Sequence, residues 1–480
     1  MLIRWGENVY TEKIDRFFRA HREEFLTDLA QLVAVNSVKG EPEPGKPYGA
    51  GPARALELAL GLAERYGLYT ENWENRLGIV QLTACQAHKL DILVHLDVVP
   101  ASAENWTVTE PFQMKEADGR VYGRGTMDDK GPALAVIYAL RAIKELGLPC
   151  KEPVRIVLGC DEENGSSELP YYFSKTQAAD MTLSPDAGWP VVNLEKGILT
   201  GTLQVQSSGV PSYVVSVKGG QASNAVPGQC EIRLCGICQE ALKPLLIRTA
   251  ERTRADFTLC SVGEELVVQV SGIPAHAAMP EKGNNAVTAA LEFLAELPDG
   301  QEPWTTLAAL FPHGDFHGEA LGVSMEHPLS GPLTLSLNVI AWEKNGLRAV
   351  FDSRLPIGFG PEQLRKLETQ FQNGGFAFAH SEAMPHYVPK ETPFIQTLLE
   401  SYEEFSGQKG FCRTIGGLTY CHGIENAVAF GMEREDVDHH LHGNDEFAIV
   451  SELLRGGKIY TSAILRLCGG GSSPSKEENI

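Results

Sequence analysis

Two apolar runs in the N-terminal half of the chain end abruptly in polar residues. Residues 90–100 form one nearly continuous hydrophobic run, and residues 153–160 form a second that passes directly into three acidic residues. A segment with helical periodicity, residues 133–146, lies between them. Apolar strands separated by a helix are typical of a sheet that is buried on both faces. The pattern predicts an α/β fold with a mixed, largely parallel sheet flanked by helices, and polar side chains gathered at the carboxyl edge of its strands.

Further helices are predicted on both sides of this region. Two N-terminal helices are expected over residues 11–35 and 53–66, separated by a loop rich in glycine and proline. After residue 389 two more helices are expected, over residues 394–405 and 447–467. These helices are the ones expected to cover the predicted sheet.

The pattern changes after Lys196-Gly197, where apolar and polar positions begin to alternate. This alternation predicts strands at residues 203–205, 213–217, 265–270, 333–339 and 347–351. A helix-like segment, residues 285–296, lies among them. The region is therefore predicted to form an inserted α+β domain.

The length of the chain also favours more than one domain, because 480 residues exceed one ordinary core. We expect a discontinuous domain of residues 1–198 and 386–468, an inserted domain of residues 199–385, and a disordered tail of residues 469–480.

Composition narrows the class of protein. Hydrophobic residues make up 43% of the chain, yet no run of about 18 apolar residues occurs, so no membrane-spanning helix is expected. A formal net charge of −21 argues against nucleic acid or an anionic membrane as a partner. The N-terminus lacks the apolar core of a signal peptide. Together with ten scattered cysteines, expected to be reduced, these features predict a cytoplasmic protein.

The segment of residues 121–135 carries two adjacent aspartates, Asp128 and Asp129, on a glycine-bearing loop that leads into a helix. Adjacent carboxylates repel each other and favour a nearby cation. A helix N-cap would explain one of the two aspartates but not both. We therefore expect Asp128 to bridge two metal ions.

Other candidate ligands follow the predicted strands. His95 and Asp97 lie on one face of a strand end, where His95 suits a metal ligand that Asp97 orients through its other ring nitrogen; a solvated strand end is the alternative. Among Asp161, Glu162 and Glu163, one carboxylate can bind metal while a neighbour serves as a general base, although consecutive acids are also common on solvated surfaces.

Two further segments extend the set. Asp186 adds a carboxylate in a turn, and residues 439–442 contain three histidines. Histidine and carboxylate ligands without a thiolate suit a site for two divalent ions, zinc first, with manganese or cobalt as variants. Two histidines and three acids, one of them shared, would leave coordination positions open for water and substrate, as a hydrolytic site requires.

Five motifs in this order resemble those of the M20 metallopeptidases, and the dipeptidase V branch above all. The resemblance covers residues 10 to 468, and its motifs are His95-Leu-Asp97, Gly123-Arg-Gly-Thr-Met-Asp-Asp-Lys-Gly131, Asp161-Glu-Glu163, Ser184-Pro-Asp186 and His442-Gly-Asn-Asp-Glu446. The resemblance implies a catalytic domain with an inserted lid, and a cis peptide between Asp128 and Asp129.

The same resemblance implies the ligand sets. One metal ion would be held by His95, Asp128 and Asp186, and the other by Asp128, Glu163 and His442. Asp97 would orient His95, and Glu162 would be the general base. Within the three-histidine segment of residues 439–442, His439 or His440 is an alternative to His442 as the last metal ligand. His442 fits the spacing to Glu446 best.

The inserted domain also carries segments that resemble the family. Residues 219–227 resemble the lid segment whose asparagine contacts substrate, which implies Asn224. Residues 275–280 resemble the segment whose histidine polarises the scissile carbonyl, which implies His276, with a packing role as the alternative. Asp352-Ser-Arg354 resembles the motif whose arginine binds the substrate carboxylate, and residues 414–419 resemble a glycine-rich substrate loop. A lid of this length resembles the branch of monomeric enzymes.

The resemblance therefore implies a metal-dependent dipeptidase that hydrolyses dipeptides or small peptides through a metal-bridging water. Two alternatives stay open. One is an N-acyl-amino-acid deacylase of the same family, and the other is a non-catalytic metal-binding protein on the same scaffold.

Overall fold

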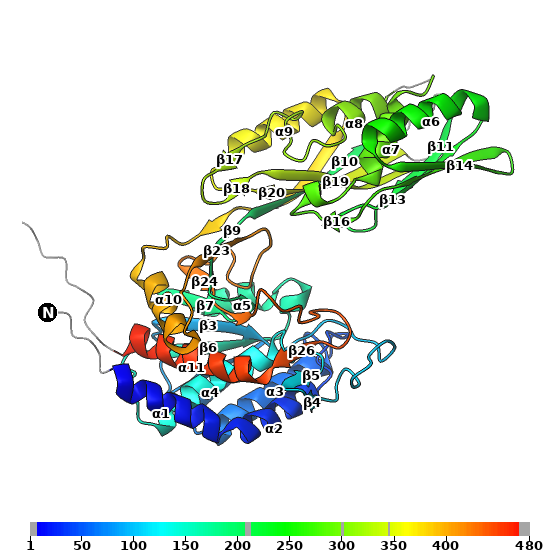
Figure 1. The fold of residues 1–480 in the computed structure, drawn as a ribbon. Coiled ribbons are helices and arrows are strands. Elements are labelled where there is room, and N and C mark those ends of the chain that lie inside the picture. The colour runs from blue at the N-terminus through cyan, green and yellow to red at the C-terminus, as the bar shows by residue number, and fades with distance from the viewer. Residues whose placement is uncertain (1–6, 207–212, 299–301, 344–345, 470–480) are drawn as a thin grey trace, which may run out of the picture. The chain divides into compact units, whose positions relative to one another are not determined.

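The structure is a computed structural model that describes residues 7–206, 213–298, 302–343 and 346–469 (Figure 1). The expected disordered tail lies outside these residues, except for Gly469. The chain divides into two compact units. The second unit comprises Glu195–His386 and Thr414–Leu418, and the first comprises the remaining described residues.

The first unit is built on a nine-stranded mixed sheet. Its strand order is β1-β2-β6-β3-β7-β24-β9-β22, with β23 paired to β9. The central pairs β6/β3, β3/β7 and β7/β24 are parallel, whereas β1/β2 and β2/β6 are antiparallel. The strands are β1 (Tyr69–Trp73), β2 (Leu77–Gln81), β3 (Leu90–His95), β6 (Val154–Gly159), β7 (Met181–Ser184), β9 (Val191–Glu195), β22 (His386–Tyr387), β23 (Cys412–Ile415) and β24 (Ala427–Ala429). The predicted fold class is confirmed.

Helices cover both faces of this sheet. One face carries the large core formed with α1 (Glu7–Ala20), α2 (Arg22–Val33), α3 (Ala50–Arg65), α4 (Lys130–Glu145), α10 (Pro393–Ser406) and α11 (Val450–Cys468). The other face carries a smaller core with α5 (Glu168–Lys175) and the segment of residues 420–427. Strand β3 alternates between them, because Ile92 belongs to the large core and Leu93 to the small one.

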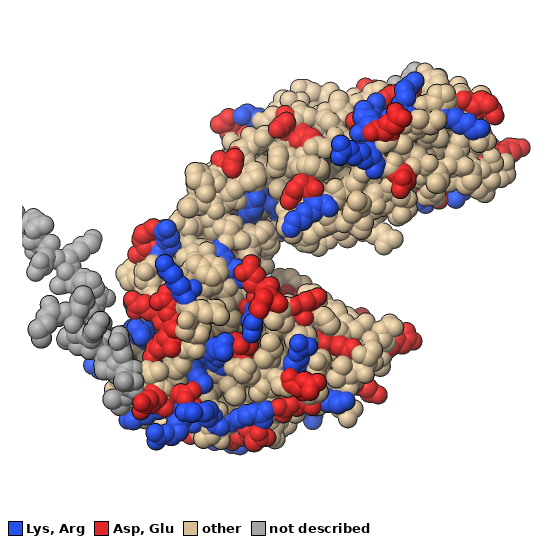
Figure 2. Space-filling model, viewed as in Figure 1, with Lys and Arg blue, Asp and Glu red and all other residues tan. Residues whose placement is uncertain are grey.

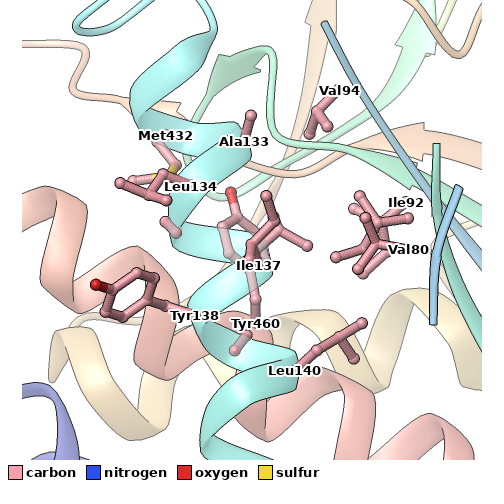
Figure 3. Packing of buried hydrophobic residues seen from close by; sticks show 14 of the residues in the cluster. Val80, Ile92, Val94, Ala133, Leu134, Ile137, Tyr138, Leu140, Met432 and Tyr460 are labelled. Atoms are coloured by element: carbon pink, nitrogen blue, oxygen red, sulfur yellow. The ribbon is translucent and has the colours of Figure 1, made fainter. Parts of the chain in front are cut away.

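Helix α4 is the central helix of the large core. Every residue from Lys130 to Ile143 is buried, as expected of a helix that is apolar on all sides. Ile137 and Leu140 point toward Ile92 and Val80 of the sheet, and Tyr460 of α11 lies beside Ile137 (Figure 3). The N-terminus of this buried helix carries the Asp128-Asp129 loop.

Two predicted helices were wrong in extent. The helix expected over residues 11–35 is two helices, because His21 leaves the helical conformation (φ −100°, ψ 13°). The helix expected over residues 447–467 starts only at Val450, because Phe447–Ile449 form strand β26. Strand β26 pairs with β5 (Arg120–Tyr122), which pairs with β4 (Lys115–Ala117), and β8 (Ala187–Gly188) pairs with β25 (Met432–Glu433).

The second unit has an eight-stranded sheet of order β14-β15-β13-β11-β19-β20-β10-β21, in which all neighbouring strands pair antiparallel. Its strands are β10 (Gly197–Val205), β11 (Val214–Gly219), β13 (Gln229–Leu234), β14 (Asp256–Val262), β15 (Glu265–Ser271), β19 (Thr334–Glu343), β20 (Gly346–Leu355) and β21 (Ala377–Ala383). One face packs against α6 (Gln239–Thr253), α7 (Ala286–Ala295), α8 (Trp304–Leu310) and α9 (Pro361–Asn373). Short pairs are β12 (Ala225–Val226) with β16 (Ala275–His276), and β17 (Glu326–His327) with β18 (Gly331–Pro332).

The surface carries both signs of charge. Acidic and basic side chains are interspersed on the visible face of each unit (Figure 2). Within the described residues, every helix is too short or too polar to cross a membrane.

Candidate metal centre

The candidate centre lies at the carboxyl edge of the first unit's sheet. Strand β3 ends at His95, β6 ends two residues before Asp161, and β7 ends at Ser184. These strands are parallel, so their carboxyl ends meet at one edge. Glu162 and Glu163 lie in a 3₁₀ turn directly after β6, and Asp186 follows β7.

Asp128 lies between two imidazoles. Its Oδ1 is 3.2 Å from Nε2 of His95, and its Oδ2 is 2.8 Å from Nε2 of His442. The residue is 8% exposed, and the peptide bond between Asp128 and Asp129 is cis. The two oxygens of one carboxylate thus face two different potential metal ligands, which is the arrangement that a bridging carboxylate requires.

Potential ligand atoms fall into two groups. His95, Glu162 and Asp186 form one group, and Asp128, Glu163 and His442 form the other, with the ligand atoms of each group within 4.8 Å of one another. Nε2 of His95 is also 3.7 Å from Oδ2 of Asp186. All six residues come from the set expected from sequence.

Asp129 lies at the N-cap position of α4 but does not cap the helix with its side chain. Its Oδ2 instead accepts a hydrogen bond from the backbone N–H of His95, at 3.1 Å. Asp129 therefore ties the end of β3 to the loop that carries Asp128.

Asp97 differs in part from its expected geometry. Nδ1 of His95 is 3.1 Å from the backbone carbonyl of Asp97 and 3.5 Å from its carboxylate. The carboxylate accepts the backbone N–H groups of Glu162 and Glu163, each at 3.1 Å. The side chain of Asp97 therefore orients the turn of Glu162 and Glu163. The backbone carbonyl of Asp97 is what mainly orients the imidazole of His95.

The electrostatics of the centre favour cations. Burial raises the pKa of Glu162, and burial followed by the charge of Asp128 raises the pKa of Asp186. Hydrogen bonding to Asp128 and Glu163 raises the pKa of His442 to about 10. A bound cation would stabilise the ionised carboxylates of Glu162 and Asp186, and it would replace the proton that Asp128 and Glu163 hold on His442.

Two buried atoms at the centre add to this fit. Nε2 of His95 and Oε1 of Glu163 are buried and make no well-aligned hydrogen bond to any described residue, although Oδ1 of Asp128 and Nε2 of His442 lie 3.2 and 3.3 Å from them. Such orphaned atoms are costly unless a ligand satisfies them. Divalent metal ions coordinate imidazole nitrogens and carboxylate oxygens, so the residues present fit a site for two such ions.

The neighbouring histidines have other environments. His439 is 3% exposed; its Nδ1 lies 3.0 Å from the carbonyl of Phe447, and its Nε2 accepts the backbone N–H of Arg434 at 3.4 Å. His440 is exposed and stands outside both ligand groups. Of the three histidines, His442 is the one placed beside Asp128 and Glu163.

The expected substrate-binding residues of the second unit lie on two short segments. Ala225 pairs with His276, and the carbonyl of Asn224 accepts the N–H of Ala277 at 3.0 Å, so Asn224 and His276 are close neighbours. His276 is exposed, and its Nδ1 accepts the N–H of Ala278 at 3.1 Å. The neutral ring therefore carries its proton on Nε2.

Arg354 is only 4% exposed and is held by neighbours within the second unit. Nε and Nη2 donate to the carboxylate of Asp352 at 2.8 and 3.1 Å, and Nη1 donates to the carbonyl of Gly416 at 2.6 Å. The role of Asp352 was not foreseen from the sequence, although it stands two positions before Arg354, on the same face of strand β20.

Comparison with known proteins agrees with these features. The model of peptidase family M20/M25/M40 matches residues 92–466. A putative dipeptidase, YtjP, of Bacillus subtilis is 30% identical over 93% of this chain and 97% of its own length. The Beta-Ala-Xaa dipeptidase of Lactobacillus delbrueckii subsp. lactis is 32% identical over the same shares.

The fold also matches a solved structure. The crystal structure of human carnosine dipeptidase 1 aligns with a TM-score of 0.57 and 16% identity, over 95% of this chain and 98% of that one. The family match spans most of the chain and includes the segments that form the candidate centre. This chain belongs to the peptidase family M20/M25/M40.

Proposed function

We propose that the chain is a metal-dependent dipeptidase of the dipeptidase V-like branch, with two divalent ions, zinc before manganese or cobalt. The observation that carries the proposal is Asp128, whose two carboxylate oxygens face His95 and His442. The family match and the two relatives with dipeptidase names support a small peptide as substrate.

The proposed ligands are those implied by the resemblance. His95, Asp128 and Asp186 would hold one ion, and Asp128, Glu163 and His442 the other. The second set is one of the two observed groups, and His95 and Asp186 share the other with Glu162. The 3.2 Å distance between Oδ1 of Asp128 and Nε2 of His95 supports Asp128 as a member of the first set. The bound ions supply Lewis acidity, which activates water and polarises the scissile carbonyl at neutral pH.

Glu162 is the proposed general base. It lies in the same group as His95 and Asp186, and its backbone N–H is fixed by Asp97. Its carboxylate would take a proton from the attacking water and deliver it to the leaving amine nitrogen. One residue can perform both transfers because the amine is formed where the water was activated.

Residues of the second unit are proposed to bind the substrate's own groups. The Nε2–H of His276 would donate to the carbonyl oxygen as negative charge develops on it. Arg354 and Asn224 would bind the terminal carboxylate, which limits substrates to dipeptides and similar small compounds. The exposed ring of His276 and the fixed guanidinium of Arg354 support these roles.

Assembly and compartment belong to the same proposal. A long inserted domain supports a monomer, as the resemblance to the monomeric branch implies. The cytoplasm is the proposed compartment, whose reducing conditions suit ten cysteines that form no disulfide among the described residues.

The test is a side-by-side assay of dipeptides and N-acyl amino acids with Zn²⁺, Mn²⁺ or Co²⁺. We expect dipeptide hydrolysis that a chelator abolishes and metal restores. Glu162→Gln is expected to keep about two ions, by elemental analysis, and to lose roughly 10²- to 10⁴-fold in kcat. Glu168→Gln is the matched control, because Glu168 is a buried glutamate outside both ligand groups, and its kcat should be retained.

Three results would contradict the proposal. Turnover of N-acyl amino acids alone would identify a deacylase. Metal binding without turnover of either substrate class would identify a non-catalytic protein. Substantial turnover by Glu162→Gln would remove this residue from the role of base.

A further inference from the structure

Glu446 is a buried carboxylate outside both ligand groups. It lies four residues after His442 and is 0% exposed. Its Oε1 accepts backbone N–H groups of Gly125, Met127 and Asp128 at 3.1, 3.0 and 3.2 Å. Its Oε2 is 3.1 Å from the same N–H of Gly125. The loop that carries Asp128 is thus wrapped around this carboxylate, as backbone N–H groups wrap a bound anion.

Arg124 extends this contact to the segment of His442. Its Nη1 donates to Oε2 of Glu446 at 2.5 Å, and its Nη2 donates to the carbonyl of Gly443 at 2.9 Å. The guanidinium is nearly buried, with 2% of the residue exposed. The planar guanidinium of Arg124 therefore binds both the carboxylate of Glu446 and the backbone of Gly443, the residue that follows His442.

Main-chain pairing brings the two segments together. Phe447 pairs with Tyr122 across strands β26 and β5, and the N–H of Gly123 donates to the carbonyl of Glu446 at 3.0 Å. The pairing places Glu446 beside the loop, but it does not set the direction of the peptide groups within the loop. That direction follows from the hydrogen bonds to the carboxylate.

We propose that Glu446 is a positioning residue for the metal centre, which sets the backbone of Asp128 directly and that of His442 through Arg124. The inference rests on the proposed role of Asp128 and His442 as metal ligands. A carboxylate suits this place because it only accepts hydrogen bonds, and every group that faces it here is a donor. Other buried acids of the first unit, such as Glu452, lack these contacts with the loop.

Glu446→Gln tests this directly, because the amide keeps the shape but turns one acceptor into a donor that faces other donors. We expect the affinity for Zn²⁺ and for Mn²⁺ to fall by roughly 10- to 100-fold, as for other residues that orient metal ligands. The measurement is calorimetric titration of the metal-free full-length chain with each ion. At saturating metal we expect kcat to recover and the KM for a dipeptide to stay at the wild-type value.

Glu452→Gln is the matched control. Glu452 is a buried glutamate of the same unit that is ion-paired with Arg455 at 2.8 Å, so its loss also leaves a half-buried arginine without this carboxylate. The control should lower the free energy of unfolding while the metal affinity stays unchanged. Arg124→Lys is a second variant, because an ammonium cannot reproduce the planar fork; it should weaken metal binding in the same direction but less.

Unchanged metal affinity in both Glu446→Gln and Arg124→Lys would overturn the inference, and so would a loss of equal size in Glu452→Gln. If Glu446→Gln does not fold, the metal affinity of Arg124→Lys alone tests the inference. The titration is read without substrate, so a wild-type chain that binds two ions and hydrolyses no dipeptide would contradict the proposed function and leave this inference standing.

Discussion

At the scale of single residues, Arg354 has only part of its hydrogen-bonding capacity left for a ligand. A guanidinium has five N–H donors. Asp352 accepts from Nε and Nη2, and the carbonyl of Gly416 accepts from Nη1. One N–H on each Nη is left for a ligand such as a carboxylate.

Arg354→Lys should therefore raise the KM for dipeptides by about 10- to 100-fold with a smaller change in kcat, because a charge-assisted hydrogen bond contributes about 1.5–3 kcal/mol. The matched substrate is the same dipeptide with an amidated C-terminus, which offers no carboxylate. Its KM should be high with the wild-type enzyme and change little in the variant. Equal losses for the acid and the amide would show that Arg354 acts on the structure and not on the carboxylate.

The role of a single residue could be predicted from the sequence where the residue lies in a recognisable motif. The spacing from His442 to Glu446 selected His442 over His439 and His440, and the structure places His442 beside Asp128. Contacts that depend on tertiary structure were not predictable in this way. The carboxylate of Asp97 holds backbone groups 65 and 66 residues away, and Glu446 holds loop residues more than 300 positions distant.

At the scale of helices and strands, periodicity predicted the buried elements best. Strands β3 and β6 and helix α4 are mostly apolar and buried. β6 and α4 were expected close to their observed bounds, whereas the apolar run of residues 90–100 continues beyond the end of β3 at His95. Helix α9 was missed because only Leu367 and Phe371 of its residues are buried, which leaves a mostly polar segment. Strand β26 was mistaken for the start of α11, because three apolar residues fit either element and its partner β5 is remote in sequence.

Helix α5 begins with a buried acid that should make the stability of the fold depend on pH. Glu168 accepts a hydrogen bond from the hydroxyl of Tyr420, and its Oε2 has no partner among the described residues. Burial raises its pKa from 4.5 to about 7. The folded state thus holds this proton more tightly than the unfolded chain, so stability that is present below pH 4.5 is lost as the pH rises to about 7.

Glu168→Gln should remove this pH-dependent term, since the amide is neutral at every pH. Relative to the wild type, the free energy of unfolding of the variant should rise by about 3 kcal/mol between acid and neutral pH. Urea unfolding of both proteins across this range measures the difference, in which the other titrating groups cancel. A difference that stays constant with pH would show that Glu168 has the same pKa in the folded and the unfolded chain.

At the scale of the whole molecule, the formal net charge of −21 and the interspersed charges on the visible surface favour a chain that repels its own copies (Figure 2). Both units have their own hydrophobic core. We therefore expect light scattering to give the mass of one chain, 52.3 kDa, at micromolar concentrations and moderate salt. A mass near twice this value that persists on dilution would contradict the proposed monomer.

The role of Asp128 is tested most directly by anomalous diffraction from crystals grown with Zn²⁺. Two peaks are expected, about 3.5–4 Å apart, with one oxygen of Asp128 about 2.0–2.2 Å from each. His95 and Asp186 should complete one site, and Glu163 and His442 the other. A single peak, or two peaks of which only one contacts Asp128, would contradict the bridging role on which the proposed function rests.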